Sequence, residues 1–336
     1  MQTADARTQL TRLVNAYRQS QCIGVAAQLQ LPERLAAGPR SAADLAAECG
    51  AHEPSLRRLL RALVAMQVLT EDPPERFGIT ALGEQLGADL VGPAARLFNS
   101  PHYWAAWANL EHSVRTGERA FDFTFGMHNW DFYATHPEEG ALFDRVMSAN
   151  TLPIAGRIAD AFDFSRFSFI TDVGGGDGTL LMAIVQRHPS VRGMVFDRPD
   201  VIERARKRIA DAGMADRCEV ASGNFMDHVP EGAAAYVMKW IIHDWSDSES
   251  IRILERCHAA GAATGAHVIV IDRVLPERIG PDDLDDLLAD LNMMVMPGGR
   301  ERTETEFRAL FEQAGFSLER VVPTGTHLKV LEAVPR

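Results

Sequence analysis

Apolar residues in the N-terminal part of the chain recur at the spacing of helices. A first stripe predicts a helix with one apolar face and consists of Leu10, Leu13, Val14 and Tyr17. A short helix is expected over 42–49, because Ser41 can cap its start and Gly50 can end it. A longer helix is expected over about 53–67, where leucines fall on one face.

Two short runs typical of strands follow at 68–70 and 77–80, with a turn around Pro73-Pro74 between them. Helix, turn, helix and hairpin in this order look like a winged helix, which suggests DNA binding. Residues 1–95, however, contain nine Arg, no Lys and ten Asp or Glu. Because phosphate contacts dominate the affinity for nucleic acid, this balance disfavours a DNA-binding regulator. We expect the unit to be a dimerisation module.

Residues 96–165 are predicted to be helical and are rich in aromatic side chains. From residue 167 the pattern changes to strands that alternate with helices, which implies a mostly parallel sheet covered on both faces. Strands are expected over 169–173, 194–197, 219–221, 235–238 and 267–274, and helices over 179–187, 200–212, 248–260 and 303–314. The last two strands, 318–324 and 328–334, are joined by a short Gly-Thr turn and must run antiparallel.

This pattern divides the chain into three parts. Residues 1–95 are predicted to form the winged-helix domain, and residues 96–165 a helical linker that contributes to a ligand pocket between domains. Residues 166–336 are predicted to form an α/β domain of the Rossmann type, a fold that binds ligands at the carboxyl ends of its strands.

A glycine-rich loop, Asp172 to Gly178, follows the first strand of that domain and opens a helix. Such a loop at the carboxyl edge of a parallel sheet is a ligand site. A dinucleotide motif would need glycine at Thr179, whereas the observed G-x-G-x-G after an acidic residue is the pattern for S-adenosylmethionine. Asp197, at the end of the next strand, can accept hydrogen bonds from ribose hydroxyls, and by itself it would suit NAD as well.

Four segments then make a specific resemblance: DVGGGDG, FDRPDV, MKWIIHDWSD and PGGRERTETEF, in this order along the chain. With them the chain resembles the plant-type small-molecule O-methyltransferases and their bacterial relatives in natural-product pathways. The resemblance covers nearly the whole chain. It implies a class I methyltransferase domain with a seven-stranded sheet and an antiparallel C-terminal strand, an N-terminal winged-helix dimerisation domain, and a homodimer.

The resemblance also implies roles for individual residues. His243 matches the general base, and Asp272 and Glu301 match the two acidic residues that flank it. S-adenosylmethionine, which leaves as S-adenosylhomocysteine, would be bound by Asp172, Gly174, Gly176, Asp197, Arg198, Asn224, Phe225, Met226 and Lys239. Candidate substrate contacts, chosen by position, are Met147, Asn150, Trp240, Asn292, Met293 and Met296.

The chemistry of methyl transfer agrees with these roles. A phenol has a pKa near ~10 and is mostly protonated at neutral pH, so a base improves it as a nucleophile. The in-line displacement at a sulfonium needs no metal. Two departures from the family pattern bear on the site: Asp272 stands where plant members usually have Glu, and Asn224 stands where Asp is common.

Composition limits the remaining alternatives. A length of 336 residues favours two domains, and a net charge of −12 disfavours nucleic-acid partners. No apolar run reaches the ~20 residues of a membrane helix, and the polar start lacks a secretory signal, so a cytoplasmic protein is expected. The four cysteines have no metal-type spacing. A relative that keeps the cofactor but performs hydroxylation, decarboxylation or a pericyclic step remains the alternative function, and the substrate is not specified.

Overall fold

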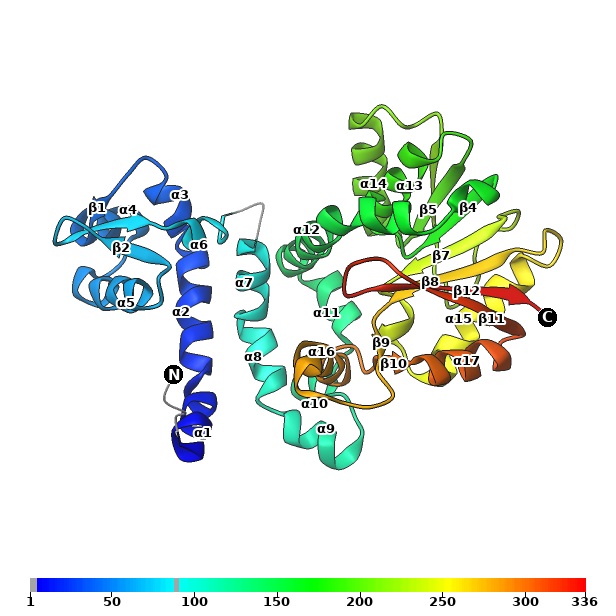
Figure 1. Cartoon of the computed structure of the whole chain (residues 1–336). Helices are drawn as coiled ribbons and strands as arrows, with labels where there is room; N and C mark the ends of the chain where they lie inside the picture. The colour runs from blue at the N-terminus through cyan, green and yellow to red at the C-terminus, as the bar shows by residue number, and fades with distance from the viewer. Residues whose placement is uncertain (1–4, 88–90) are drawn as a thin grey trace. The chain divides into compact units, whose positions relative to one another are not determined.

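The structure is a computed structural model that describes residues 5–87 and 91–336. It divides into two compact units (Figure 1). The first comprises residues 1–105 and 138–149, and the second comprises residues 106–137 and 150–336. The domain boundaries expected at residues 95 and 165 remain a prediction, and residues 88–90 of the first expected domain lie outside the described residues.

The first unit contains the helix–turn–helix and hairpin that the pattern predicts. Ser41 caps the expected helix by accepting the N–H of Asp44, and Gly50 ends it at φ 64°. The three strands pair antiparallel in the order β1-β3-β2. The elements are α1 (Ala6–Asn15), α2 (Tyr17–Gln28), α3 (Leu31–Leu35), β1 (Arg40–Ser41), α4 (Ala42–Cys49), α5 (Glu53–Ala65), β2 (Leu69–Glu71), β3 (Arg76–Ile79), α6 (Ala81–Glu84), α7 (Gly92–Phe98) and the first residues of α8 (Pro101–Trp107), whose last two residues belong to the second unit.

The apolar faces that the sequence predicts on two helices of this unit differ in burial. Leu56, Leu60 and Leu63 of α5 are buried in the core of the unit. The stripe on α1 and the start of α2 is exposed instead: Leu10 is 62% exposed and Leu13 is 71% exposed. The predicted apolar face therefore exists, but nothing within the described chain buries it.

Residues 96–165, which were expected to be helical, are mostly helical. It contains α9 (Leu110–Thr116), α10 (Ala120–Phe125), α11 (Asn129–Thr135) and α12 (Pro137–Ala161). The last of these has 25 residues and contributes to both units. None of the described helices combines the length and the apolar character needed to cross a membrane.

The second unit is built on a seven-stranded sheet with the order β11-β12-β8-β7-β4-β5-β6. All its neighbours pair parallel except β12, which runs antiparallel to β8 and to β11. This confirms the predicted mostly parallel sheet with an antiparallel C-terminal strand. The strands are β4 (Phe169–Val173), β5 (Arg192–Asp197), β6 (Cys218–Ser222), β7 (Ala235–Lys239), β8 (His267–Asp272), β11 (Phe316–Pro323) and β12 (Lys329–Pro335).

Helices cover both faces of this sheet (Figure 1). Along β8, Ile269 and Ile271 point into the core formed with α12, α13 (Thr179–Arg187) and α14 (Pro199–Asp211). Val268 and Val270 point into the opposite core, formed with α15 (Asp247–Ala260) and α17 (Glu304–Gln313). A strand that is buried on both faces reads as a continuous apolar run, which explains the uninterrupted pattern of 268–271.

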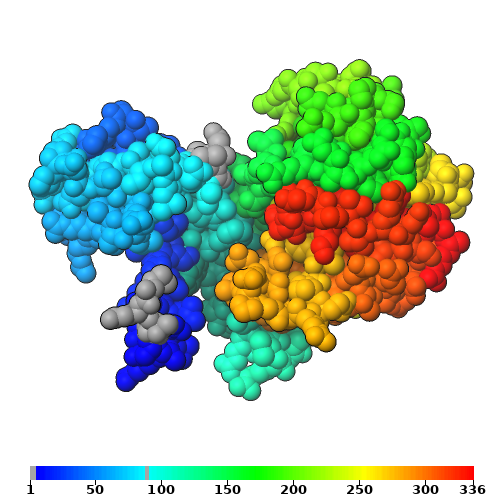
Figure 2. Space-filling view, in the orientation of Figure 1, coloured from blue at the N-terminus to red at the C-terminus, as the bar shows by residue number. Residues whose placement is uncertain are grey.

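Several short elements of the second unit were not predicted. Strands β9 (Val274–Leu275) and β10 (Arg302–Thr303) form a small parallel pair, and α16 (Leu284–Val295) lies between them in sequence. The single turns η1 (Phe164–Arg166), η2 (Ile242–Asp244) and η3 (Pro281–Asp283) complete the unit. Figure 2 shows the segment before and within α16 at the surface beside the C-terminal hairpin, and Ile279 and Leu284 in it are more than half exposed.

One buried carboxylate, Glu332 of β12, holds together several elements of the sheet. It is fully buried and accepts hydrogen bonds from His267 Nδ1 at 2.7 Å, from Arg320 Nε at 2.7 Å and from Arg166. Burial raises the pKa of Glu332, but the hydrogen bonds from His267, Arg166 and Arg320 outweigh it and leave the pKa below its usual value. The carboxylate therefore stabilises the fold in its charged form.

The substitution Glu332→Gln is expected to lower the free energy of unfolding by about 3 kcal/mol at neutral pH, because three donors then face one neutral amide. A lowered native pKa gives stability that is present above the unfolded pKa and lost as the pH falls through the native one. The difference should therefore shrink below about pH 4. Urea unfolding at several pH values measures it. Glu319→Gln, on the exposed side of the same hairpin, is the control, and equal stability of the two variants would contradict the prediction.

Candidate active site

The glycine loop between β4 and α13 has the backbone that its sequence predicts. Gly174, Gly176 and Gly178 have φ values of 68°, 60° and 80°, in the left-handed region that favours glycine. A Cβ atom on Gly174 would lie 2.3 Å from Cδ1 of Ile241, whereas one on Gly176 would meet nothing within 4 Å. The loop is thus closely packed at its start and open at its centre.

Asp197, at the end of β5, is tied to this loop. Its Oδ2 accepts the N–H of Gly176 at 2.9 Å, and its Oδ1 accepts the N–H of Arg198 at 2.7 Å. Burial raises the pKa of Asp197 despite these two donors. Each carboxylate oxygen has a further lone pair, so Asp197 can still accept hydrogen bonds from ligand hydroxyls. The guanidinium of Arg198 is paired with Asp200, with Nη2 2.6 Å from Oδ2.

Buried Asp172 and partly buried Lys239 lie at the ends of neighbouring strands. Burial raises the pKa of Asp172 in β4 to about 7, and burial lowers the pKa of Lys239 in β7 to about 8. Oδ2 of Asp172 has no hydrogen-bond partner among the described residues. The ammonium of Lys239 lies 3.5 Å from the ring centroid of Trp240. A ligand with an ammonium and a carboxylate, such as the amino-acid end of S-adenosylmethionine, would complement these two groups.

The residues expected beside the adenine form a turn after β6. Asn224 is exposed and fixes the turn: its Oδ1 accepts the N–H of Met226 at 3.0 Å, and its Nδ2 donates to Asp227 at 3.0 Å. An aspartate at this position could accept the first hydrogen bond but could not donate the second. Phe225 packs edge-on against Trp245, with ring centroids 5.9 Å apart. The same ring lies beside Gly174, so the structure brings Phe225 to the glycine loop.

His243 and Glu301 form a buried pair although they are far apart in sequence. Nδ1 of His243 lies 2.9 Å from Oε1 of Glu301, and the two residues are 8% and 2% exposed. The hydrogen bond at Nδ1 leaves Nε2 as the ring nitrogen that can take up a proton. Nε2 lies 3.5 Å from Oδ1 of Asp244.

Three acidic residues surround the His243 ring. Burial favours the neutral ring, but the charges of Glu301, Asp244 and Asp272 outweigh it and raise the pKa of His243 to about 10. Burial in turn raises the pKa of Asp244 to about 6 and that of Asp272 to about 7. The site thus binds protons strongly, and His243 is its strongest base.

The two acids expected to flank His243 do different things. Glu301 makes the hydrogen bond, whereas Asp272 uses its Oδ1 to accept the N–H of Trp240 at 2.9 Å. Trp240 has φ 57°, which is strained for a bulky residue, and the acceptor on Asp272 stabilises that backbone. The short aspartate thus holds the backbone of Trp240, and it also acts on the His243 ring through its charge.

The candidate substrate residues differ in their contacts, in their burial and in the compact unit to which they belong. Trp240 stacks on His327 with ring centroids 6.0 Å apart, and Asn292 accepts a hydrogen bond from Nε1 of Trp107 at 3.2 Å. Near the end of α16, Met293 is partly buried and Met296 is almost fully buried. Asn150 is exposed on α12, and Met147 belongs to the other compact unit.

Sequence reasoning missed three residues that support the pair. Asp290 of α16 accepts the N–H of Glu301 at 2.8 Å, and Arg273 brings its Nε within 4.0 Å of the Glu301 carboxylate. Asp244 lies beside Nε2 of His243. Of these three residues, only Asp244 could have been singled out from the sequence, since it directly follows His243 in the segment MKWIIHDWSD. Among the described residues, no group of three His, Cys, Asp or Glu side chains is arranged to hold a metal ion.

Comparisons with known proteins agree with this geometry. The O-methyltransferase domain family matches residues 107–317, and the O-methyltransferase dimerisation domain family matches residues 11–88. Phenazine O-methyltransferase PhzM of Lysobacter antibioticus is 39% identical over 97% of this chain and 95% of its own. The mitomycin biosynthesis 6-O-methyltransferase of Streptomyces lavendulae is 40% identical over 91% and 88%.

A solved structure extends the comparison to ligands. The O-methyltransferase NcsB1 from neocarzinostatin biosynthesis, in complex with S-adenosylmethionine and 2-hydroxy-5-methyl naphthoic acid, is 33% identical. It matches with a TM-score of 0.84 over 95% of this chain and 96% of its own.

A parallel sheet with a glycine loop after its first strand and an acid ending the second defines a Rossmann-like, nucleotide-binding class of enzyme. Within that class the sheet of this protein, with its antiparallel strand β12, has the class I methyltransferase fold. The chain belongs to the O-methyltransferase family, and it carries the dimerisation domain of that family at its N-terminal end.

Replacing Glu301 with Gln is expected to lower the pKa of His243 from about 10 by about 1 to 3 pH units, because an adjacent anion is removed. Asp244 and Asp272 would keep it above that of an unperturbed histidine. NMR titration of isotope-labelled histidine measures the change. Glu304→Gln, which removes the same charge from an exposed position three residues away, is the control. An unchanged His243 pKa in the Glu301 variant would refute the assignment.

Proposed function

We propose that this protein transfers a methyl group from S-adenosylmethionine to a phenolic hydroxyl of a small aromatic natural-product intermediate, with His243 as general base. The observation that carries the proposal is the buried His243–Glu301 hydrogen bond. It lies next to the glycine loop in the fold, since Ile241 packs against Gly174 just before His243. The aromatic ligand of NcsB1 and the phenazine and mitomycin activities of the relatives support the substrate class.

S-adenosylmethionine supplies an electrophilic methyl group on a sulfonium sulfur, and S-adenosylhomocysteine is the product. Gly174, Gly176 and Asp197 would hold the adenosine, and the turn 224–226 would lie beside the adenine. Asp172 and Lys239 would hold the amino-acid end, because they are buried charges that need partners there.

His243 acts on the acceptor hydroxyl. Its Nε2 takes the phenolic proton as the oxygen attacks, while Glu301 on Nδ1 fixes the tautomer and stabilises the imidazolium that forms. The raised pKa of His243, about 10, matches the pKa of a phenol near ~10, so the proton moves between groups of similar affinity. Below that pKa the ring already holds a proton, so the active neutral form gains population as the pH rises.

Incubation with deuterated-methyl S-adenosylmethionine and a panel of hydroxylated phenazines, naphthoates and benzoates tests the proposal by mass spectrometry. The wild type should yield a product that carries the deuterated methyl group. His243→Gln should lower kcat about 10²- to 10⁴-fold, the usual contribution of a general base. His258→Gln, a histidine of α15 that packs on Phe316, should retain activity.

Two outcomes would contradict this proposal. Equal rates for His243→Gln and the wild type would refute the base and leave positioning as the main catalytic effect. Cofactor binding by calorimetry with no labelled product from any acceptor would refute transfer to an aromatic hydroxyl. An unlabelled but altered substrate would then identify the hydroxylating, decarboxylating or pericyclic alternative.

The proposal includes a homodimer formed through the N-terminal unit. The match to the dimerisation domain covers residues 11–88, and three of the four exposed residues of the apolar stripe, Leu13, Val14 and Tyr17, lie within that range. Exposed apolar patches of this kind mark interaction surfaces. A two-fold axis would bring the same stripe of two copies together, as in most homodimers.

Leu13→Glu is expected to produce a monomer, because it places a charge at the most exposed position of the stripe. Sedimentation velocity at micromolar concentration measures the mass. Leu82→Glu is the matched control, since Leu82 of α6 is 57% exposed and lies outside the stripe. A dimer that persists unchanged in the Leu13 variant would show that the stripe is not the interface.

A further inference from the structure

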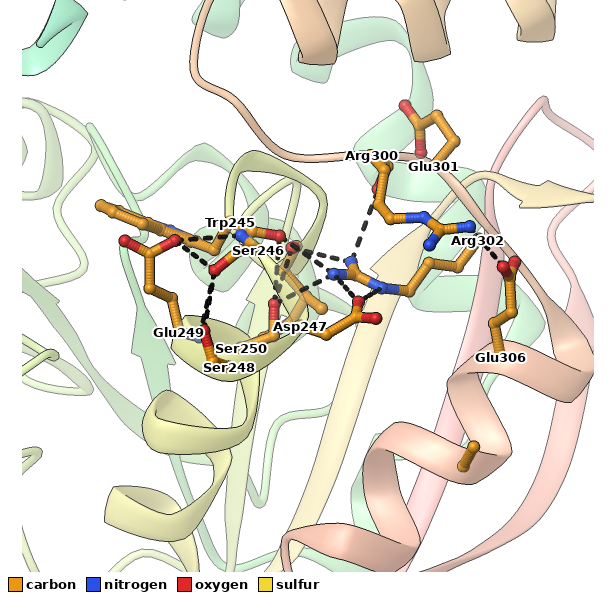
Figure 3. Close-up of polar contacts among 12 residues, drawn as sticks. Trp245, Ser246, Asp247, Ser248, Glu249, Ser250, Arg300, Glu301, Arg302 and Glu306 are labelled. Carbon is orange, nitrogen blue, oxygen red and sulfur yellow. Dashed lines mark hydrogen bonds and ion pairs between the residues drawn. The ribbon is translucent and has the colours of Figure 1, made fainter. Parts of the chain in front are cut away.

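Arg302 of β10 is a charged side chain that the fold buries almost completely, with 1% of its surface exposed. Figure 3 shows its guanidinium between the turn 245–250 and the backbone of Arg300. Its Nε and Nη2 donate to Oδ1 of Asp247 at 3.0 and 2.7 Å. A guanidinium buried to this degree has to be matched by acceptors on all sides, and here most of them belong to the segment 242–250.

Two further acceptors of Arg302 bracket His243, and the carbonyl oxygen of Arg300 and Oγ of Ser250 also accept from its guanidinium, at 3.4 and 3.3 Å. Nη1 donates to the carbonyl oxygen of Ile242 at 3.1 Å, and Nη2 donates to that of Trp245 at 2.9 Å. His243 lies between these two carbonyl groups in sequence. Arg302 directly follows Glu301, the hydrogen-bond partner of His243 (Figure 3). Its guanidinium therefore connects the segment of Glu301 to the backbone on either side of His243.

The same two segments also touch directly through their backbones. The N–H of Arg300 donates to the carbonyl oxygen of His243 at 2.8 Å. A Cβ atom on Gly299 would lie 2.0 Å from that oxygen, so only glycine allows this approach. The segments of His243 and Glu301 are thus joined twice: by a backbone hydrogen bond from Arg300, just before Glu301, and by the side chain of Arg302, just after it.

We propose that Arg302 is a positioning residue that holds His243 and Glu301 at hydrogen-bond distance and thereby sets the strength of the base. The proposal rests on the proposed function, in which His243 is that base. Arginine suits the task because its planar guanidinium presents five donors in a fixed geometry, whereas lysine concentrates three donors at one point. Lysine at this position would keep the charge and lose the simultaneous contacts to Asp247, Ile242 and Trp245.

The variant Arg302→Lys is expected to lower kcat about 10- to 100-fold at the alkaline plateau, since small displacements of a catalytic group cost rates of this order. The KM for S-adenosylmethionine should stay within about twofold, because the hydrogen bonds of Arg302 go to residues outside the glycine loop. The acid limb of the pH profile of kcat should move to lower pH, because a loosened Glu301 raises the pKa of His243 less. A purely structural defect would not move that limb.

Arg320→Lys is the matched control. Arg320 also directs Nε and Nη2 to a single carboxylate oxygen, that of Glu332, each at 2.7 Å. The substitution removes the same pair of guanidinium donors from the sheet hairpin and should change thermal stability without changing kcat or its pH profile.

Asp247→Asn is the second test variant, because this half-exposed carboxylate can be neutralised with little risk to folding. It should move kcat and the acid limb in the same direction as Arg302→Lys, by a smaller amount.

A double-mutant cycle with His243→Gln separates this inference from the function on which it rests. If Arg302 acts through His243, adding Arg302→Lys to His243→Gln should lower the residual kcat less than twofold. Full additivity, or a wild-type kcat and pH profile for both Arg302→Lys and Asp247→Asn, would overturn the positioning role. A wild-type rate for His243→Gln alone would instead refute the base, and the inference would fall with it.

Discussion

Parallel pairing of β4, β5, β7 and β8 is the constraint on which the rest of the molecule depends. Parallel strands end at the same edge of a sheet, so Asp172, Asp197, Lys239 and Asp272 meet there although they are far apart in sequence. Both faces of the sheet are covered, and the edge is therefore poorly solvated. Burial in turn drives the pKa of the acids up and that of the lysine down, which prepares the edge for a zwitterionic, hydroxyl-bearing ligand.

The pairing of His243 with Glu301 depends on a second, smaller arrangement outside the sheet. The chain leaves β8, forms β9 and α16, and returns as β10 beside β9. This return carries Glu301 to His243 across 58 residues of sequence. Gly299 permits the close backbone approach, and the buried Arg302 closes it from the other side. A buried cation surrounded by carbonyl groups tolerates few other arrangements, so Arg302 helps to hold the segments of His243 and Glu301 together.

Elements with local signals were predicted closely. The helix 42–49 begins at the Ser41 cap and ends at Gly50, and both signals lie within two turns of the residues they define. The strand 169–173 and the helix 179–187 were predicted with the bounds that the structure has, since glycines separate them sharply. The helix α16 was not predicted. The pair β9–β10 was not predicted either, because strands of two residues carry no periodicity and become strands only by pairing with each other.

The sequence by itself determined the fold class and the glycine loop, and it singled out His243 and Glu301, because each depends on residue type at fixed spacing along one element or motif. Tertiary structure alone decided how these parts act. Whether Asp272 holds a ring or a backbone, whether the stripe at Leu13 is covered, and whether Arg302 is a surface charge or a buried support all depend on what packs alongside. Local spacing describes one chain segment, whereas burial and hydrogen bonding are properties of segments brought together from distant parts of the sequence.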